Sequence, residues 1–234
     1  MKKLVLLTLF TFLVTLCASA ADTLYFYGGD FDPSNPNANG LANENDAIIS
    51  GTPYGAATYQ NFTVSGGGIT VTKMFTNNFS QLNPSTGYWE LRSGVSEGNG
   101  GTLIASGTNA MTQTPTGRSD FGYTEYTDLV SGLSVNLANG TYWFAVVPQD
   151  LGTGGRSFNS NTLGLNAVGT QASDLQFWNS AYFGANFTNA DNEGPYSIFS
   201  SGVYVGGGVP EPSTLIMLGS GLLAAAGAVR RRLL

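Results

Sequence analysis

Short apolar runs alternate with polar, turn-forming stretches along most of the chain. Between Thr23 and Val205 helical periodicity is hard to find, whereas β-branched and aromatic runs recur between Gly, Asn, Ser and Pro residues. In residues 69–72 the apolar side chains face one way and the threonines the other, as in a half-buried strand. Residues 141–147 are apolar on both faces, which fits a central strand. The pattern predicts about nine strands, the clearest at 23–27, 57–64, 69–75, 86–92, 102–105, 121–130, 141–147, 174–178 and 196–205.

These strands predict a single all-β domain. Short strands with turns about every ten to twenty residues are typical of an antiparallel β-sandwich or a jelly-roll-like fold. We assign this body to residues 21–205, a length at which one domain can bury most of its unfolded surface. The chain has 32 glycines, which favour long connections, and Asn35 to Asn45 is the longest stretch without a predicted element.

The first residues have the layout of a secretory signal peptide. Lys2 and Lys3 supply a positive start, an apolar run occupies residues 4–16, and small residues follow at 18–20. The apolar run is too short to be a comfortable membrane span. We therefore expect residues 1–20 to form a signal helix that the Sec translocon and a signal peptidase handle, and the body to be exported.

Composition excludes several classes of function. The one cysteine, Cys17, lies in the signal peptide, and the chain has no histidine. The mature protein therefore has no intramolecular disulfide, no thiolate or imidazole metal site and no Ser/His/Asp catalysis. Between Asp22 and Val209 four basic residues stand against fourteen acidic ones, a net charge of −10. Such a body is repelled by nucleic acid and by anionic headgroups, so we expect it to contact a membrane only through its tail.

The chain ends in a segment of different composition, residues 206–234. Three glycines form a flexible tether, and two prolines flanking a glutamate hold an extended segment. The uncharged run 215–229 is helical in composition and, at roughly 1.5 Å per residue, about 22 Å long, which is short for a permanent membrane span. The arginines after it are expected to stay cytoplasmic. The candidate sorting residues are Val209, Pro210, Glu211, Pro212, Arg230, Arg231 and Arg232.

This order of parts resembles the PEP-CTERM sorting signal, in which VPEP precedes a short Leu/Ala/Gly helix and a terminal arginine run. An ordinary C-terminal membrane anchor is the alternative. The resemblance implies an exosortase as partner, a membrane enzyme that recognises the PEP motif and removes the tail. It also implies a site at the cell surface or in an exopolysaccharide matrix, after transient anchoring in the inner membrane by the C-terminal helix.

Two further resemblances bring no activity. The tail is also known as the C-terminal domain of ice-binding proteins, a label that describes a tail and not the domain in front of it. In the body, phrases such as GTYWFAVVPQ resemble uncharacterised exported PEP-CTERM proteins. Both support the fold and the destination alone.

Acidic residues gather in a loop that could bind calcium. Asp30, Asp32 and Asp46 lie in a Gly/Asn/Pro-rich segment with further amide and carboxylate oxygens. Calcium binds six to eight such oxygens, and extracellular calcium fills weak sites. The spacing departs from the EF-hand pattern because Asn35 stands where the turn glycine belongs. A solvated loop built on Asx turns is the alternative, and we expect no other cofactor.

Aromatic residues supply a candidate glycan platform. Sugar-binding sandwiches use exposed rings with amide or carboxylate neighbours, and aromatic residues of a sandwich can equally be core residues. Trp178 lies beside polar residues in a loop-rich region, near Tyr182, and is our main candidate. Trp89 follows Tyr88, so one of these two is expected to face outward.

Carboxylates offer a different function, glycoside hydrolysis. Glu90, Glu97, Glu125 and Asp128 are available, but nothing in their spacing marks a catalytic pair. We therefore expect no enzyme activity, with a secreted carbohydrate-active enzyme as the alternative.

The third class considered is ice binding. Thr112, Thr114 and Thr116 lie on one side of an extended strand, yet no neighbouring segment repeats the array. The leading hypothesis is an exported β-sandwich, sorted by an exosortase, with a structural or carbohydrate-binding role in or on the extracellular polysaccharide.

Overall fold

Extended, hydrogen-bonded backbone dominates residues 21–172, 175–194 and 198–206, which are the residues that this computed structural model describes. The predicted signal peptide and all the candidate sorting residues lie outside these ranges. The described residues contain thirteen strands and one short 3-10 helix. The elements are β1 (Thr23–Tyr27), β2 (Gly40–Ala42), β3 (Asn45–Asp46), β4 (Ala57–Val64), β5 (Ile69–Ser80), β6 (Thr86–Ser93), β7 (Thr102–Asp120), β8 (Tyr123–Leu137), β9 (Gly140–Asp150), β10 (Ser157–Ser160), β11 (Phe177–Ser180), β12 (Ala185–Asn189), η1 (Ala190–Glu193) and β13 (Ser201–Val205).

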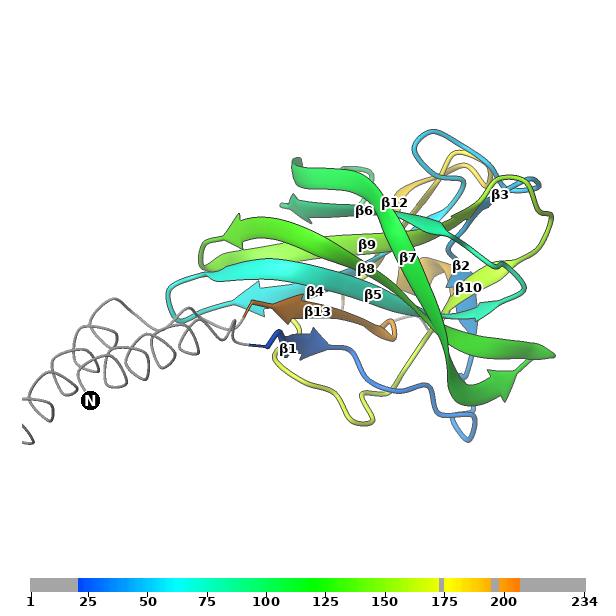
Figure 1. Ribbon diagram of the computed structural model, residues 1–234, viewed down its shortest axis with the longest axis horizontal. Coiled ribbons are helices and arrows are strands. Elements are labelled where there is room, and N and C mark those ends of the chain that lie inside the picture. Colours follow the sequence, from blue (N-terminus) through cyan, green and yellow to red (C-terminus); the bar gives the residue numbers. More distant parts are fainter. Residues whose placement is uncertain (1–20, 173–174, 195–197, 207–234) are drawn as a thin grey trace, which may run out of the picture. The chain divides into compact units, whose positions relative to one another are not determined.

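The strands lie in two layers that share one long strand, β7. In the first layer β1, β13, β5 and β8 follow one another, and β7 pairs with β8 from Met111 onward. In the second layer β7 pairs with β6 up to Ala110, and β9, β4, β11 and β12 follow. Figure 1 shows β7, in green, running diagonally across the other strands. The pairs of this path are antiparallel, so the prediction of an all-β antiparallel sandwich is confirmed.

Three short strands extend the layers at one end. β10 pairs with the last residues of β5, beyond Thr76, where the pairing of β5 with the first residue of β13 stops, and carries β2 on its other edge. β3 pairs in parallel with the end of β9. All the strands belong to one unit, Thr23–Val205.

The interior between the layers is apolar at one end and polar at the other. Alternate residues of a strand share a face, so each strand contributes an inward row. At the apolar end the inward rows contain Phe62, Met74, Val130 and Val203, which are buried in one cluster. Two residues along the same strands, toward the other end, stand Gln60, Thr76, Asp128 and Ser201, which are also buried.

The predicted strands differ from the observed ones mainly in extent. The ranges 23–27 and 57–64 coincide with β1 and β4, whereas β7 continues far beyond the predicted 102–105. The last predicted strands are shorter than expected, since β11 begins at Phe177 and β13 at Ser201. The sequence pattern missed β2, β3, β10 and β12 because they are short, and because β3, β10 and β12 are mostly polar.

Candidate functional site

Trp178, the main candidate for an exposed sugar platform, is buried. Its side chain is 6% exposed and shares an apolar cluster with Phe199. The indole Nε1–H donates to the carbonyl oxygen of Ala42 at 2.9 Å. The prediction of exposure is wrong because β11 lies between β4 and β12, where its polar neighbour Ser180 is itself buried and donates to the carbonyl of Gly55.

The other two predicted platform residues differ in exposure. Tyr182 follows β11 in a turn and is 56% exposed, with its ring centroid 4.9 Å from that of Phe183. Trp89 is buried in the apolar interior, and Tyr88 is buried in a second cluster. The expectation that one of these two faces outward is wrong, because the protein covers both faces of β6.

The structure does not bring Asp30, Asp32 and Asp46 together as metal ligands. Among the described residues no group of three or more His, Cys, Asp or Glu side chains is placed to hold a metal ion. Asp32 Oδ1 accepts from the amide and the hydroxyl of Ser34, at 2.9 and 2.7 Å. Asp46 is buried, and its Oδ1 accepts from the amide of Ile49 at 2.7 Å. Each of these carboxylates is thus engaged locally and not in a shared ligand set, and calcium binding stays a prediction.

The carboxylates considered for hydrolysis are also engaged separately. Glu90 is buried and paired with Arg92, whose Nε donates to Oε1 at 2.7 Å. Glu97 is exposed and accepts from the amide of Asn189 at 2.6 Å. Neither faces a second free carboxylate across a described pocket.

Asp128 is buried inside the polar end of the sandwich. Its carboxylate accepts from Asn78 Nδ2 at 2.7 Å and from Gln113 Nε2 at 3.0 Å. Burial raises the pKa of Asp128 to about 7, although the two hydrogen bonds act in the opposite direction. The raised pKa shifts Asp128 toward its protonated form, and the side chain lies away from the surface.

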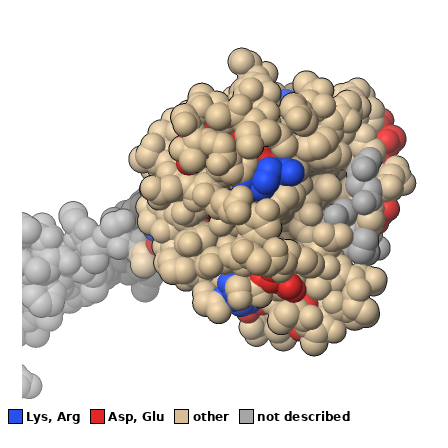
Figure 2. Space-filling model, turned by 90° about the vertical axis from the view of Figure 1, so that its right-hand side faces the viewer, with Lys and Arg blue, Asp and Glu red and all other residues tan. Residues whose placement is uncertain are grey.

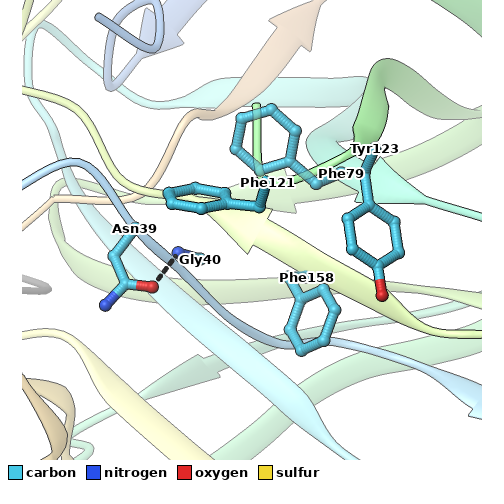
Figure 3. A pocket seen from close by; sticks show the side chains of 6 residues that line it. All are labelled: Asn39, Gly40, Phe79, Phe121, Tyr123 and Phe158. Carbon is cyan, nitrogen blue, oxygen red and sulfur yellow. Dashed lines mark hydrogen bonds between the residues drawn. The ribbon is translucent and has the colours of Figure 1, made fainter. Parts of the chain in front are cut away.

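An aromatic pocket of about 170 Å³ opens on the outer face of the first layer. It forms where β5 ends, β8 begins, and β2 and β10 pair beside them. Figure 3 shows four rings around an open space, with an asparagine on one side. We call this site the aromatic pocket; its lining residues are Asn39, Gly40, Phe79, Phe121, Tyr123 and Phe158.

Phe121 occupies the tip of the β7–β8 hairpin in an uncommon conformation. Asp120 pairs with Tyr123, so Phe121 and Gly122 form a two-residue turn with φ values of 54° and 81°. Positive φ at both positions favours Asn and Gly, and for a bulky residue it is strained. The Phe121 ring is nevertheless 53% exposed, with its centroid 5.7 Å from that of Phe79. The hairpin therefore holds an exposed aromatic ring over the pocket at a position where the backbone conformation disfavours phenylalanine.

The opposite side of the pocket depends on β2 and β10. A Cβ atom at Gly40 would lie 2.9 Å from Cβ of Phe158, so the glycine keeps this part of the pocket open. Asn39 is exposed, and its Oδ1 accepts from the amide of Gly40 at 2.9 Å. Within the described residues its Nδ2 donates to no protein atom, which leaves an amide donor at the rim. The guanidinium of Arg156 lies 4.5 Å from the centroid of the Phe158 ring.

A second hollow, of about 340 Å³, lies on the same outer face. We call it the Arg118 groove. Its β5 residues, Phe75 and Asn77, share a face with Phe79 of the aromatic pocket because they alternate along one strand. The remaining lining residues are Leu24, Tyr27, Asp30, Thr116, Arg118, Thr127, Leu129 and Tyr204.

Arg118 bridges two carboxylates in this groove. Its Nε donates to Glu125 Oε2 at 2.5 Å, and its Nη1 donates to Asp30 Oδ1 at 2.9 Å. Glu125 is buried and also accepts from the hydroxyls of Ser160 and Thr116, at 2.6 and 2.8 Å. The Arg118 side chain is 25% exposed, and its Nη2 donates to no atom of the described residues.

A chain of hydrogen bonds fixes the floor of the groove. Thr127 Oγ1 donates to Asn77 Oδ1 at 2.7 Å, Asn77 Nδ2 donates to the Tyr27 hydroxyl at 3.0 Å, and that hydroxyl donates to Asp30 Oδ1 at 2.6 Å. Burial raises the pKa of Tyr27, which keeps its proton. Burial also acts to raise the pKa of Asp30, but hydrogen bonds, first from Tyr27, and the charge of Arg118 outweigh it and lower that pKa. The groove thus presents a fixed carboxylate and a fixed guanidinium.

The surface offers little free positive charge. Charged residues make up 10% of the chain, and Figure 2 shows a face on which uncharged residues dominate. Arg92, Arg118 and Arg156 each pair with a glutamate. Uncharged ligands therefore suit this surface better than anionic ones.

The predicted ice-binding threonines do not form a separate array. Thr112 and Thr114 are exposed on β7, opposite Leu129 and Thr127 of β8, while the hydroxyl of Thr116 donates to Glu125. The neighbouring strand does not repeat the row of threonines.

Sequence reasoning missed both hollows. Their residues come from segments far apart in the chain, such as Asn39 and Phe158, that long-range strand pairing brings together. One local signal was available. Asp120-Phe121-Gly122-Tyr123 places a phenylalanine before a glycine at a tight hairpin, where a small polar residue is usual.

Comparison with known proteins identifies the tail. A family model described as the PEP-CTERM protein-sorting motif matches residues 208–232, which confirms the predicted sorting signal. This motif implies an exported protein that an exosortase processes. Neither the search of curated proteins nor that of solved structures found a match. In the part of the chain that the structure describes, no helix has the length and apolarity needed to cross a membrane.

Proposed function

We propose that this exported, PEP-CTERM-sorted protein binds a neutral polysaccharide through the aromatic pocket, as a non-enzymatic component of the cell surface or extracellular matrix. The observation that carries the proposal is Phe121, an exposed ring held over a pocket of further rings in a backbone conformation that disfavours it. Strained residues concentrate at ligand-binding sites, because the surrounding structure must maintain them for a reason other than stability.

The chemistry of the pocket suits a sugar ring. The apolar faces of sugars pack on aromatic rings, and Phe121, Tyr123 and Phe158 supply such rings around one space. The Asn39 amide at the rim can donate to a hydroxyl group. The acidic body, with four basic residues against fourteen acidic ones between Asp22 and Val209, favours a neutral polymer over an anionic one.

The carboxylates favour binding over hydrolysis. A glycosidase needs one carboxylic acid and one free carboxylate on either side of the scissile bond. In the Arg118 groove Asp30 and Glu125 both pair with the same guanidinium, and Glu125 is buried. This arrangement supports a binding role for the two acids.

Binding is tested by affinity electrophoresis of the purified full chain through gels that contain dextran, mannan, xylan or hydroxyethyl cellulose, with alginate as the anionic polymer. At least one neutral polymer should retard the protein, and Phe121→Ala should weaken that retardation about tenfold or more, the equivalent of losing about 1.4 kcal/mol of binding. Tyr182→Ala is the matched control, since Tyr182 is an equally exposed ring outside both hollows. Retardation by none of the neutral polymers, or equal retardation of the Phe121 variant, would refute the proposal.

The route to the surface forms a second part of the proposal. The Sec translocon exports the chain, the apolar run 215–229 anchors it transiently in the inner membrane, and an exosortase removes the tail. In cells with an exosortase, Pro210→Ala combined with Glu211→Ala should leave an unprocessed, membrane-retained form, whereas Gly207→Ala in the linker should not. Normal size and release of the double variant would contradict the role of the motif.

A further inference from the structure

We infer that the Arg118 groove is a second subsite of the same binding site, and that the ligand is a neutral chain long enough to occupy both hollows at once. The inference rests on the proposed function and adds to it the length and the charge class of the ligand.

The two hollows share one stretch of sheet. Phe75 and Asn77 of the groove and Phe79 of the pocket form one outward row on β5, and Leu129 of the groove and Tyr123 of the pocket belong to β8. At about 3.4 Å per residue, the row from Leu129 to Tyr123 is about 20 Å long. This length exceeds one sugar ring and suits an extended chain of several.

The groove leaves defined polar atoms for a ligand. Within the described residues Arg118 Nη2 has no protein acceptor, while its Nε and Nη1 are held by carboxylates, so the free edge of the guanidinium is fixed in direction. Asp30 Oδ2 accepts one hydrogen bond, from Asn166 Nδ2 at 2.7 Å, and has a lone pair for another. A fixed donor beside a fixed acceptor matches a pair of hydroxyl groups.

Aromatic rings line the groove together with these polar atoms. The rings of Phe75 and Tyr204 lie with centroids 5.8 Å apart, and Tyr204 is half-buried at the edge of the groove. Polar groups and ring carbon in one groove are the combination that an amphipathic sugar unit requires.

The charge of the groove selects against acidic sugars. Asp30 and Glu125 each carry a negative charge, and Arg118 supplies one positive charge between them. Lys73 lies at the edge of the groove, with its ammonium 5.8 Å from the centroid of the Tyr204 ring. Around Arg118 itself two carboxylates stand against one cation, so a uronic acid or a phosphate group that enters there meets repulsion. A neutral, hydroxyl-rich chain meets none.

The test compares short and long oligosaccharides prepared from whichever neutral polymer retards the protein, by isothermal titration of the full chain. The wild type should bind the long oligosaccharide more tightly. Arg118→Lys keeps the charge but loses the planar fork, and Thr127→Val removes the hydrogen bond that fixes Asn77 in the floor of the groove. Each should reduce that affinity about tenfold, the equivalent of one hydrogen bond to a charged or fixed group lost or misplaced. Neither should change the affinity for a short oligosaccharide that fills the aromatic pocket alone.

Two controls accompany the test, and three outcomes would overturn a part of the proposal. Thr124→Val, an exposed change on the same strand, should leave both affinities unchanged, and thermal melts identify variants that do not fold.

Long-chain affinity that is equal in wild type, Arg118→Lys and Thr127→Val would overturn the second subsite while the Phe121 effect still supports the pocket. Tighter binding of alginate oligosaccharides than of neutral ones would overturn the charge class. Loss of the Phe121 effect itself would refute the proposed function and not merely this inference.

Discussion

The two ends of the sandwich interior are built on the same strands from different chemistry. On β5 the inward row passes from Met74 to Thr76 and Asn78, and on β8 it passes from Val130 to Asp128. Apolar burial stabilises roughly in proportion to area and has little directional preference. Buried polar groups add little net stability, but each leaves a costly unpaired atom if its partner moves. The apolar end therefore supplies stability, and the polar end supplies positional accuracy.

The polar end lies beneath the strands that form the aromatic pocket. Asn159 of β10 is buried, and its Nδ2 donates to Thr58 Oγ1 at 2.8 Å and to Ser201 Oγ at 3.0 Å. Its chain neighbour Phe158 faces the other way and lines the pocket. Hydrogen bonds on one face of β10 thus hold the ring on the other face in place. The comparison shows why a short, polar strand can carry part of a binding site.

The largest effect is expected at the apolar end. Phe62 is buried, and its ring packs against those of Phe26 and Phe144 with centroids 5.8 and 5.7 Å away. Phe62→Ala should lower the free energy of unfolding by about 3 to 5 kcal/mol, because it removes buried area and leaves a cavity. Urea unfolding measures the loss, which should be the same at pH 5 and pH 8 since no titrating group is involved. A loss below about 1 kcal/mol would show that this end is not the main source of stability.

The next largest effect is a change in stability that depends on pH, which is expected at the polar end and not at the apolar end. Asp128 has a pKa raised from 3.8 to about 7 in the folded state, so its contribution to stability is fully present below about pH 4 and is lost as the pH rises to about 7. Asp128→Asn removes the buried charge, and Gln113 can turn its amide to present its oxygen. The variant should match the wild type near pH 4 and exceed its stability at pH 8 by roughly 2 to 4 kcal/mol.

Glu44 supplies the control for that pH effect. It is buried, and burial raises its pKa to about 7 even though the amide of Ser157 and the charge of Arg156 act to lower it. Asp128→Asn alone should therefore flatten the pH dependence of melting between about pH 4 and pH 7 in part, and adding Glu44→Gln should flatten it further. Parallel curves for the wild type and Asp128→Asn across this window would contradict the raised pKa of the buried Asp128.

The difference between the ends also explains what could be predicted from the sequence. Alternation in residues 69–72 predicted β5 because its first inward residues belong to the apolar end. The same rule failed for β10 and for Trp178, whose polar neighbour Ser180 indicated exposure although it is itself buried. The hollows could not be predicted because Asn39 and Phe158 meet only through strand pairing. The sorting motif is a local pattern of consecutive residues, so it could be predicted without knowledge of the fold, and the family match confirms it.

A smaller effect is expected at Trp178, whose ring is buried in an apolar cluster and whose indole N–H donates a hydrogen bond. Trp178→Phe keeps most of the buried ring but removes the indole donor, which leaves the buried carbonyl oxygen of Ala42 without this partner. The free energy of unfolding should fall by about 1 to 3 kcal/mol, the cost of an unsatisfied buried group. Polysaccharide retardation of the folded variant should equal that of the wild type. Unchanged stability with lost retardation would instead restore Trp178 as part of the binding site.

The smallest effect on stability is expected at Phe121, outside both ends of the interior. Asn tolerates the positive φ that strains a phenylalanine, so Phe121→Asn should leave the free energy of unfolding unchanged or raise it by up to about 1 kcal/mol. The same variant should lose retardation by the neutral polymer, whereas Phe121→Tyr, which keeps the ring and the strain, should retain both wild-type properties. Thermal melts and affinity electrophoresis on the same samples measure the two effects. A gain in stability together with a loss of binding distinguishes a ring kept for a ligand from one kept for packing, because a packing residue would lose stability on the same change.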